Sequence, residues 1–468
     1  MSVLEVGEFV SRDGPRVVVA VGVLAAVLLL ARASVWLVRY ARAAGEVRAS
    51  MRQEIRINRG WRRLARLSGL SVTDRTPTLM TSLSTEQGRE PKPRVLVPKI
   101  HTVPDEFGVQ VTVKALPKVG LEEFQRAAPY LADAWGCTRL SVRQQSPGVL
   151  VLRAVRRDPL ISPTFHSPTG QAPQEVSIWD VGLDEYAEAI RCELANVPGI
   201  TVAGLPGYGK TSLINRLICD LAPSGAVQFA VADGKVNGAH EGDYADMQDR
   251  LFAFAGDDLE TANTLFKRLV ALMRSRSALA REYFGTTNMW HKGPSPDWPL
   301  VVLVIDEAHT FFRDHKGSDR ETKRLAALAA ENTRLVEALV KIGRSFGMLT
   351  IVATQKATGD AIPTFIRDVC PVGLSFAQKT ADAAVAALGD DIREYPDASP
   401  VALQDPRYVG VAVMSQYGRE GFVRVRTPYV EPEDAARVAA STAHLTRDPA
   451  DLLSAVRGPS LLKPPRAA

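Results

Sequence analysis

The clearest pattern in the chain is a set of short apolar runs separated by longer segments with helical periodicity. Residues 199–203 and 300–305 are almost wholly apolar, and residues 350–353 form a third run. Such continuous runs are typical of strands buried on both faces of a sheet. After the first run, residues 213–221 place their leucines and isoleucines on one helix face, and Pro223 ends the pattern. This alternation predicts an α/β fold, with a mostly parallel sheet and flanking helices.

A second and smaller α/β pattern precedes this one. Residues 95–100, 109–115, 139–143 and 149–155 read as strands, and residues 121–135 have the apolar spacing of a helix. This region contains no constellation of catalytic side chains. We therefore expect a small structural or oligomerising domain there.

The N-terminal region contains an apolar stretch long enough for a membrane span. The stretch runs from Val17 to Val38 with one charge, Arg32, and a spanning helix needs about 20 residues. Nine arginines lie between Arg39 and Arg66, so the positive-inside rule predicts a single-pass protein of the cell membrane with its C-terminal bulk in the cytoplasm. The competing interpretations are a cleaved signal peptide and a buried core helix.

The arginines after this stretch recur with helical spacing and form one basic stripe. They are Arg48, Arg52, Arg56, Arg59, Arg63 and Arg66. A basic helix face can lie on anionic lipid headgroups or on DNA. It can equally be a solvated helix face without a ligand, and the spacing alone does not separate these alternatives.

Eight consecutive residues after the first apolar run carry the strongest chemical signal. Gly-Leu-Pro-Gly-Tyr-Gly-Lys-Thr, residues 204–211, matches the phosphate-loop pattern G-x-x-x-x-G-K-[ST] between a strand and a helix. Backbone N–H groups and the helix N-terminus suit the phosphates of ATP. Lys210 is expected to reach the β- and γ-phosphates, and Thr211 to ligate Mg²⁺. The residues predicted to bind the nucleotide are Gly204, Leu205, Pro206, Gly207, Tyr208, Gly209, Lys210, Thr211 and Ser212.

The ends of the other two apolar runs complete the predicted catalytic set. Asp306 ends the second run and is expected to hold Mg²⁺, and Glu307 is expected to polarise the attacking water. Gln355 follows the third run and could sense the γ-phosphate, although an ordinary loop amide would have the same spacing.

Composition adds little that changes this interpretation. The 468 residues carry a formal net charge of +5, which is compatible with a polyanionic or membrane-surface partner. Four cysteines lie far apart, which favours free thiols over a zinc site or a disulfide framework. The pattern as a whole divides the chain into an N-terminal membrane segment (1–45), a basic helix and linker (46–93), a small α/β domain (94–157), a proline-rich linker (158–177), a P-loop domain (178–430) and a short C-terminal tail (431–468).

From about residue 178 to residue 430 the chain resembles the FtsK/SpoIIIE family of DNA-pumping ATPases. Besides the phosphate loop and Asp306-Glu307, the resemblance includes Gly-Arg-Ser-Phe-Gly at 343–347, Ile-Val-Ala-Thr-Gln at 351–355 and Ala-Asp-Gly-Lys at 232–235. In the last block Gly234 stands where the family has proline. The order of these blocks is more specific than a phosphate loop alone.

This resemblance implies a RecA-like core that assembles into a homo-hexameric ring and threads double-stranded DNA, with ATP as its only small-molecule substrate. It also implies an arginine finger donated across the subunit interface, for which Arg344 is the first candidate and Arg367 the second. The tail is too short for the winged-helix module of many members. The compact arrangement is similar to the single-span plasmid-transfer (Tra-type) proteins of actinobacteria, which implies conjugative transfer of a plasmid or integrative element and contact with membrane lipid.

Several other functions share parts of this pattern. Asp-Glu-Ala-His at 306–309 also spells a helicase box, but only one RecA-like core is evident. A chromosome-segregation pump, a protein-export motor of the type VII kind and a coupling protein for single-stranded DNA remain alternatives. The non-enzymatic alternative is a nucleotide-dependent DNA clamp.

Overall fold

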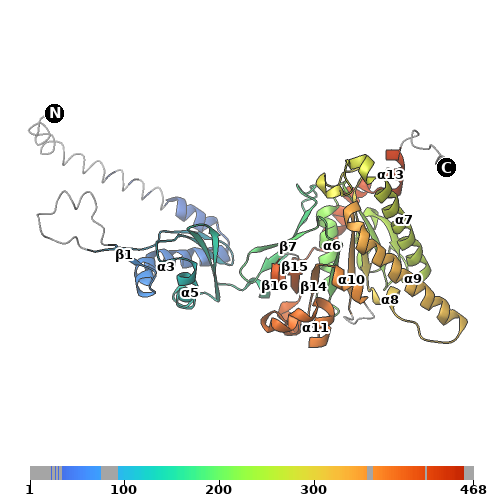
Figure 1. The fold of residues 1–468 in the computed structure, drawn as a ribbon. Helices are drawn as coiled ribbons and strands as arrows, with labels where there is room; N and C mark the ends of the chain where they lie inside the picture. The colour runs from blue at the N-terminus through green and yellow to red at the C-terminus, as the bar shows by residue number, and fades with distance from the viewer. Residues whose placement is uncertain are drawn as a thin grey trace, which may run out of the picture. The chain divides into compact units, whose positions relative to one another are not determined.

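The computed structural model describes residues 34–74, 93–355, 362–416 and 419–457, together with residues 23, 27 and 30. The chain divides into two compact units, Met1–Asp158 and Pro159–Ala468 (Figure 1). Each unit has a hydrophobic core of its own.

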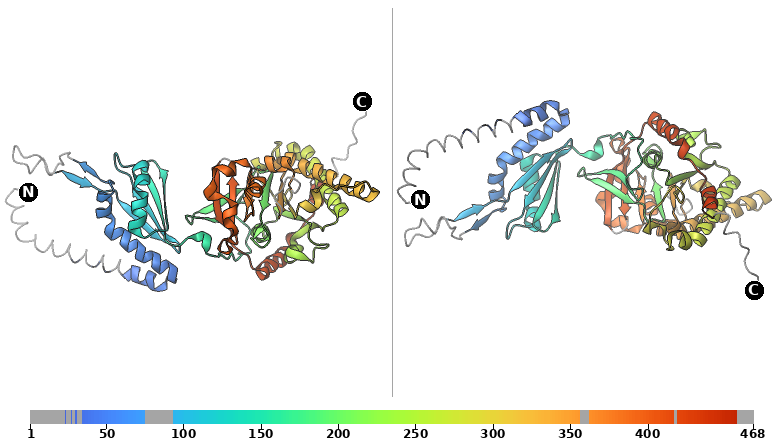
Figure 2. Two further views of the ribbon diagram at one scale, coloured as in Figure 1. Left: turned by 90° about the horizontal axis from the view of Figure 1, so that it is seen from below. Right: turned by 90° about the horizontal axis from the view of Figure 1, so that it is seen from above.

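A four-stranded antiparallel sheet forms the centre of the first unit, with the strand order β3-β4-β6-β5. Two helices, α3 and α5, pack on this sheet, as Figure 2 shows. The elements are α3 (Gly45–Leu67), β3 (Ile100–Pro104), β4 (Gly108–Lys114), α5 (Leu121–Trp135), β5 (Arg139–Ser146) and β6 (Val149–Val155). The predicted helix at 121–135 and the predicted strand at 149–155 match α5 and β6.

The predicted strand at 95–100 is wrong, because two different elements share these residues. β2 (Arg94–Leu96) pairs with β1 (Val72–Asp74) in a separate two-stranded ribbon, whereas β3 begins at Ile100. Pro98 lies between them, and proline has no N–H with which to continue a strand ladder.

Helix α3 is part of the core of the first unit. Trp61 is 4% exposed; its ring stacks on Phe124 of α5 at a centroid distance of 6.3 Å and lies tilted against Trp135 of the same helix at 6.1 Å. Its indole N–H donates a hydrogen bond to the Pro98 carbonyl at 2.7 Å. The opposite face of α3 exposes Arg52, Arg56, Arg59, Arg63 and Arg66. The predicted grouping of this helix with a linker therefore missed its packing. Five of the six arginines of the predicted basic stripe are exposed, whereas Arg48 is half-buried and donates hydrogen bonds to the carbonyl oxygens of Ala41 and Ala43.

The second unit is built on a ten-stranded sheet with the order β11-β10-β12-β13-β9-β14-β15-β16-β7-β8. The first six strands in this order are parallel, and the last four run antiparallel to their neighbours. The strands are β7 (Ile178–Asp184), β8 (Ala189–Glu193), β9 (Gly199–Ala203), β10 (Val227–Asp233), β11 (Leu251–Ala255), β12 (Leu300–Asp306), β13 (Met348–Thr354), β14 (Val372–Ser375), β15 (Val411–Gln416) and β16 (Arg419–Arg426).

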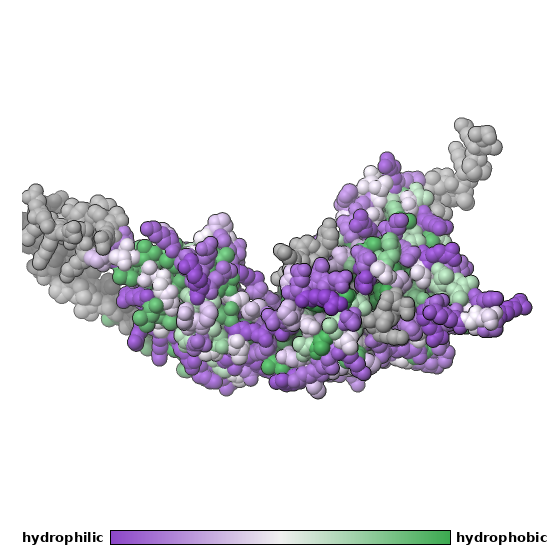
Figure 3. Space-filling view, turned by 60° about the horizontal axis from the view of Figure 1, so that its bottom comes forward, coloured by the Kyte–Doolittle hydropathy of each residue, from purple (hydrophilic) through white to green (hydrophobic). Residues whose placement is uncertain are grey.

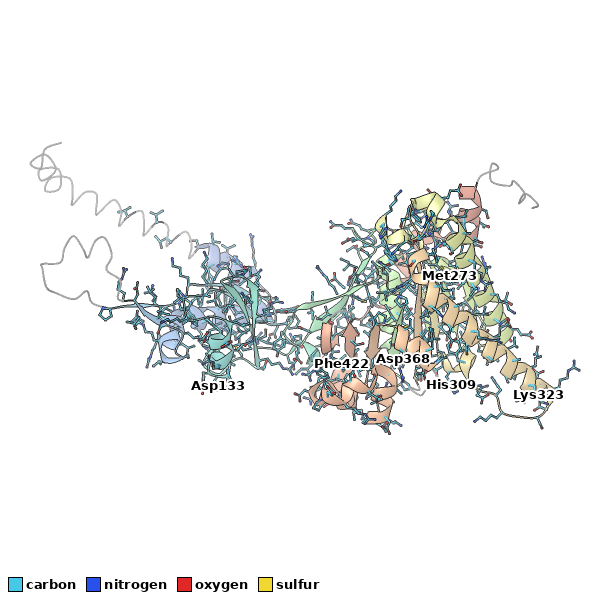
Figure 4. All side chains as sticks on the ribbon, in the orientation of Figure 1. Asp133, Met273, His309, Lys323, Asp368 and Phe422 are labelled. Carbon is cyan, nitrogen blue, oxygen red and sulfur yellow. The ribbon has the colours of Figure 1, made fainter. Side chains whose placement is uncertain are left out.

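Helices cover both faces of this sheet, which confirms the predicted α/β class. Successive residues of β12 alternate between the two cores: Val302 and Val304 face the layer of α6 and α12, and Val301 and Leu303 face the layer of α7 and α9. Met273 of α7 is buried in the second layer, and Lys323 of α9 is exposed (Figure 4). The helices are α6 (Lys210–Leu221), α7 (Leu259–Phe284), α8 (His309–Phe312), α9 (Arg320–Ile342), α10 (Thr364–Val369), α11 (Ala381–Leu388), α12 (Pro432–Thr442) and α13 (Pro449–Arg457).

The described part of the predicted C-terminal tail is folded onto the P-loop unit. Val438 and Ala439 of α12 are buried in the same core as α6, and Leu453 of α13 is buried in the core of α7. The Leu445 carbonyl, between these helices, accepts a hydrogen bond from the buried side chain of Gln228 at 2.9 Å. The unit therefore continues to about residue 457, beyond the predicted boundary at 430.

The predicted membrane span lies mostly outside the described residues. Of the stretch 17–38, only residues 23, 27, 30 and 34–38 are described. Within the described parts of the chain, the structure contains no helix long and apolar enough to cross a membrane. On the face drawn in Figure 3, hydrophilic side chains cover most of the described surface, with small apolar areas between them.

Candidate nucleotide-binding site

The phosphate loop leaves the C-terminal end of β9, near the middle of the sheet. β9 lies between β13 and β14, whereas the next strand in the chain, β10, lies on the far side of β12. A crevice opens at the strand ends where the strand order reverses in this way, and ligands of α/β sheets bind there. The predicted motif is thus placed at the position that favours ligand binding in this topology.

Two glycines in the loop are required by its geometry. Gly204 has φ +146°, and a Cβ built on it would lie 2.6 Å from Cβ of Phe376. Gly209 has φ +109° and is the N-cap of α6. A side chain at either position would be strained. The loop can therefore bring the backbone N–H groups at the N-terminus of α6 close to a phosphate.

Lys210 is held inside the loop. Its side chain is buried, and Nζ donates hydrogen bonds to the carbonyl oxygens of Gly204 at 2.7 Å and Leu205 at 3.0 Å. Burial lowers the pKa of Lys210 to about 8, while the nearby carboxylates of Asp306 and Glu307 oppose that effect. The ammonium group is thus positioned where the loop would enclose a phosphate.

Asp306, at the end of β12, is the centre of a buried polar cluster. One of its carboxylate oxygens accepts from Lys235 Nζ at 3.0 Å, from the Tyr244 hydroxyl at 3.1 Å and from Thr211 Oγ1 at 3.4 Å. Asp233, at the end of β10, pairs directly with Asp306 across the sheet. The predicted Mg²⁺ ligands Thr211 and Asp306 are therefore brought together, as expected.

The electrostatics of the cluster follow from its burial. Burial and the neighbouring Asp306 raise the pKa of Asp233 to about 6. Burial lowers the pKa of Lys235, but the carboxylates of Asp306, Asp243 and Asp233 outweigh it and leave that pKa raised. Lys235 therefore stays charged and neutralises part of a concentrated negative charge.

Glu307 follows Asp306 in a strained backbone conformation. Its φ of +51° lies in the left-handed region, which residues with a Cβ rarely adopt. Burial, and then the negative charge of Asp306, raise the pKa of its carboxyl, while a hydrogen bond from the backbone N–H of Gln355 opposes the shift. The Oε2 atom is buried and has no hydrogen-bond partner among the described residues. Unsatisfied buried acceptors are uncommon and are candidates for a functional role.

The residues fit a magnesium nucleotide. Thr211 and Asp306 offer hard oxygen ligands, which Mg²⁺ prefers, and Oε2 of the adjacent Glu307 is a buried acceptor without a partner among the described residues. Within the described residues, no group of three or more His, Cys, Asp or Glu side chains forms a metal-binding cluster. A metal held by one carboxylate and one hydroxyl together with nucleotide phosphates agrees with that finding.

A cavity of about 820 Å³ opens over the phosphate loop. Its lining includes the predicted residues Pro206, Gly207, Gly209, Lys210, Thr211, Ser212 and Gln355. It also includes residues that the sequence pattern did not single out: Ile161, Pro163, Thr164 and Phe165 from the predicted proline-rich linker, and Pro406, Arg407, Val409, Arg426, Thr427 and Tyr429 from the far end of the unit. The side chains of Leu205 and Tyr208 pack against a hydrophobic cluster, and the prediction that these residues bind the nucleotide stays a prediction.

The two arginine-finger candidates do not line this cavity. Arg344 is exposed just before β13, at the end of that strand opposite Gln355, and it lines a different cavity of about 670 Å³. Arg367 of α10 forms an ion pair at 3.2 Å with its neighbour Asp368, which is labelled in Figure 4. Neither is positioned to contact a nucleotide bound to its own chain, so a role for either would require a second subunit.

Lys235 and Tyr244, the hydrogen-bond partners of Asp306, are two polar residues of the site that sequence reasoning passed over. Lys235 ends the block 232–235, which was quoted only for its resemblance and received no role. The signal for it was available, since a lysine directly after a strand end lies at the same sheet edge as Asp306. Tyr244 lies in a 3₁₀ segment, Gly242–Arg250, and nothing in the local pattern marks it.

Comparison with known proteins agrees with this site. The FtsK/SpoIIIE family model matches residues 168–295. DNA translocase FtsK of Leptospira interrogans is 25% identical over 247 residues, which cover 50% of this chain and 24% of that protein. DNA translocase FtsK 1 of Neisseria meningitidis is 23% identical and covers 63% of this chain and 39% of the relative. The match to this chain thus spans between about a quarter and two fifths of the length of these relatives.

Solved structures with a similar chain course include a conjugation coupling protein and a secretion ATPase. The pCW3 conjugation coupling protein TcpA has a TM-score of 0.48 at 18% identity, over 77% of this chain and 94% of that one. The cytoplasmic domain of the type VII secretion ATPase EccC of Thermomonospora curvata has a TM-score of 0.45 at 18% identity, over 63% of this chain and 34% of that one. The match of residues 168–295, together with the geometry of the phosphate loop, shows that the chain carries an ATPase domain of the FtsK/SpoIIIE family.

Proposed function

We propose that the protein is an ATP-driven translocase of double-stranded DNA. The observation that carries the proposal is the convergence of three strand ends: the phosphate loop after β9, Asp306 after β12 and Gln355 after β13. The names of the relatives, which are DNA translocases, support DNA as the substrate. The basic net charge of +5 is compatible with a polyanion.

The arrangement of side chains suggests how hydrolysis would proceed. Bound Mg²⁺ would neutralise the charge that develops on the phosphates during transfer. The N-terminus of α6 and Lys210 hold and orient those phosphates. In this mechanism Glu307 would accept a proton from the attacking water, and its raised pKa would make it a better base than an exposed carboxylate. The backbone N–H of Gln355 fixes the Glu307 carboxyl.

The setting of the activity is a finer part of the proposal. A homo-hexameric ring would bring an arginine of a neighbouring subunit to the cavity, with Arg344 as the first candidate, in addition to Arg407 and Arg426 of the same chain. The apolar N-terminal stretch 17–38 is compatible with the setting that we propose, which is conjugative transfer of a plasmid or integrative element at the cell membrane. A segregation pump for chromosomes and a protein-export motor are the alternatives.

The deciding experiment measures the ATPase rate of the full chain with no nucleic acid, with single-stranded DNA and with long duplex DNA, at several salt concentrations. The proposal expects strong stimulation by duplex DNA that weakens as salt rises, because phosphate contacts release counterions. Stimulation by single strands alone would favour a coupling protein for single-stranded DNA. A rate indifferent to all DNA would make protein export the better explanation.

Two variants separate binding from chemistry. We expect Lys210→Ala to lose ATP binding and therefore turnover. We expect Glu307→Gln to lose turnover while still binding ATP, since the amide keeps the shape but cannot accept a proton. Wild-type turnover in Glu307→Gln would show that another group is the base.

A further inference from the structure

Two aromatic side chains stand exposed at the end of the nucleotide cavity contributed by the segments before β7 and after β16. Phe165 is 68% exposed and Tyr429 is 40% exposed, and both line the cavity that also contains Lys210 and Thr211. Their rings meet edge to face, with centroids 6.3 Å apart and an interplanar angle of 84°. The ring of an exposed phenylalanine forms no hydrogen bonds with water, and covering it is favourable. This pair therefore offers an apolar surface to a ligand.

Backbone hydrogen bonds fix the two residues side by side. Phe165 and Tyr429 form a parallel β-bridge. His166 N–H donates to the Tyr429 carbonyl at 2.8 Å, and Tyr429 N–H donates to the Thr164 carbonyl at 2.8 Å. The backbone of the fold therefore fixes the pair, although its two residues are far apart in the sequence.

The same segment is also tied to the helix that carries the phosphate loop. The His166 imidazole Nε2 lies 2.6 Å from one carboxylate oxygen of Asp220 in α6, and the Trp179 indole N–H donates to the other at 3.0 Å. Helix α6 begins at Lys210 of the phosphate loop. The same helix therefore connects the aromatic pair with the residues expected to bind phosphate. Their relative position is thus set before any ligand binds.

The cavity has two chemically different ends. One is the phosphate loop with its buried ammonium group. The other end is lined by the aromatic pair and by the apolar residues Ile161, Pro163 and Val409, and Arg407 and Arg426 also line the cavity. A volume of about 820 Å³ falls in the usual range for sites of small ligands and cofactors. A nucleotide has the same division, with a polyanionic tail and a flat aromatic base.

We propose that Phe165 and Tyr429 form the base-binding end of the site and contact the adenine ring of ATP. The inference rests on the proposed function in one respect, namely that the phosphate loop holds the phosphates of ATP. A flat base can lie against the exposed face of Phe165 while the edge of Tyr429 supports that ring, and this contact covers apolar area on both partners. The two residues thereby distinguish a nucleoside triphosphate from a bare polyphosphate.

The test compares equilibrium binding of ATP and of inorganic tripolyphosphate to the full chain by calorimetry, each with Mg²⁺. Phe165→Ala and Tyr429→Ala should each weaken ATP binding on the order of tenfold, the effect that loss of one aromatic–base contact has elsewhere. Neither change should alter the affinity for tripolyphosphate. Phe365→Ala, which removes a partly exposed phenylalanine outside the cavity, is the matched control and should leave both affinities unchanged.

Lys210→Ala separates failure of this inference from failure of the proposed function. It should weaken both ligands, since both bring phosphates to the loop. If Lys210→Ala weakens both ligands while the two aromatic variants bind ATP normally, the base lies elsewhere and only this inference fails. If Lys210→Ala leaves both affinities intact, the phosphate loop does not bind nucleotide and the proposed function fails with it.

A conservative variant guards against a folding defect. Phe165→Trp keeps an aromatic face and should retain ATP affinity within about threefold of the wild type. In this variant, addition of ATP should change the tryptophan fluorescence, because the base would lie against the new indole, and tripolyphosphate should not reproduce the change. Loss of ATP affinity in Phe165→Trp as severe as in Phe165→Ala, or equal fluorescence changes with both ligands, would overturn the assignment.

Discussion

Among single residues, the Asp306 carboxylate shows most directly how this site depends on its surroundings. It is fully buried beside a second acid, Asp233, and its charge is balanced by Lys235 and by the Tyr244 hydroxyl. A buried charge that loses its partner is costly, because no water replaces the lost interaction. Lys235 thus occupies the position of a counter-ion to the predicted magnesium ligand.

Replacement of Lys235 by alanine should therefore destabilise the protein. We expect a loss of about 1–3 kcal/mol in the free energy of unfolding, below the full value for a buried pair because the lysine side chain is 25% exposed. Added Mg²⁺ with ATP should recover part of this loss by supplying another cation near Asp306. Chemical denaturation with and without Mg²⁺ and ATP measures both effects. Lys267→Ala, which removes an exposed ion pair with Glu331, should change stability by less than about 1 kcal/mol.

Glu307 illustrates a conflict between activity and stability. Its pKa is raised by burial, so the ionised form is less favourable in the folded chain than in the unfolded chain. The unfolded carboxyl loses its proton first as pH rises above about 4.5, and stability falls until the folded carboxyl has also ionised. Glu307→Gln does not titrate and should raise the melting temperature at pH 7 by roughly 2–4 °C.

The same variant should match the wild type more closely at pH 4, where both side chains are neutral. Thermal melts at pH 4 and pH 7 make the comparison. A melting temperature of Glu307→Gln below the wild type at pH 7 would mean that the carboxylate is stabilised in the fold, contrary to its burial.

From the sequence alone, the site residues that could be predicted are those that belong to one local motif. The phosphate loop and the strand end at Asp306 were predicted because each signal lies within a few consecutive residues. Phe165 and Tyr429 were not, because 264 positions separate them and only the bridge between their backbones brings them together. The segment containing Phe165 is rich in proline and was therefore predicted to be a linker. For this reason its contribution to the cavity was not predicted.

Among the single elements, the basic helix α3 has two different faces, one exposed and one buried, whose residues alternate along its sequence. Its arginines mark the exposed face, and the buried face carries Ile57, Trp61 and Ala65. The arginine spacing was read correctly from periodicity, but the packing partner was not, because the sheet that covers the buried face follows much later in the chain. Of the ten strands of the P-loop unit, the three that were predicted from apolar runs match β9, β12 and β13 within two residues, because fully buried strands are apolar throughout.

Loss of the indole at Trp61 should destabilise the first unit by about 3–5 kcal/mol. Trp61→Ala removes contacts with Phe124 and Trp135 and leaves the Pro98 carbonyl without its donor. Urea denaturation followed by circular dichroism measures the change. Arg59→Ala, on the exposed face of the same helix, should stay within about 0.5 kcal/mol of the wild type. Equal losses in the two variants would contradict the assignment of the buried face.

On the scale of the whole molecule, the division into two units with separate cores has a thermodynamic consequence. We expect two transitions in calorimetric unfolding of the full chain, since cooperativity follows the extent of a core. ATP with Mg²⁺ should raise the transition of the P-loop unit, by about 2.7 kcal/mol of added stability at a ligand concentration 100 times Kd. The transition of the first unit should not move. A single transition that shifts as a whole would show that the two units unfold together.

The bridge between Phe165 and Tyr429 also determines where the ATPase unit can be cut. The motif pattern places its start at residue 178, and an expression fragment begun there would keep every residue of the phosphate loop. Such a fragment would lack Phe165 and the backbone partners of Tyr429, and with them one wall of the cavity. A fragment begun at Pro159, the first residue of the unit, retains that wall and is the shorter version suited to crystallisation with a nucleotide.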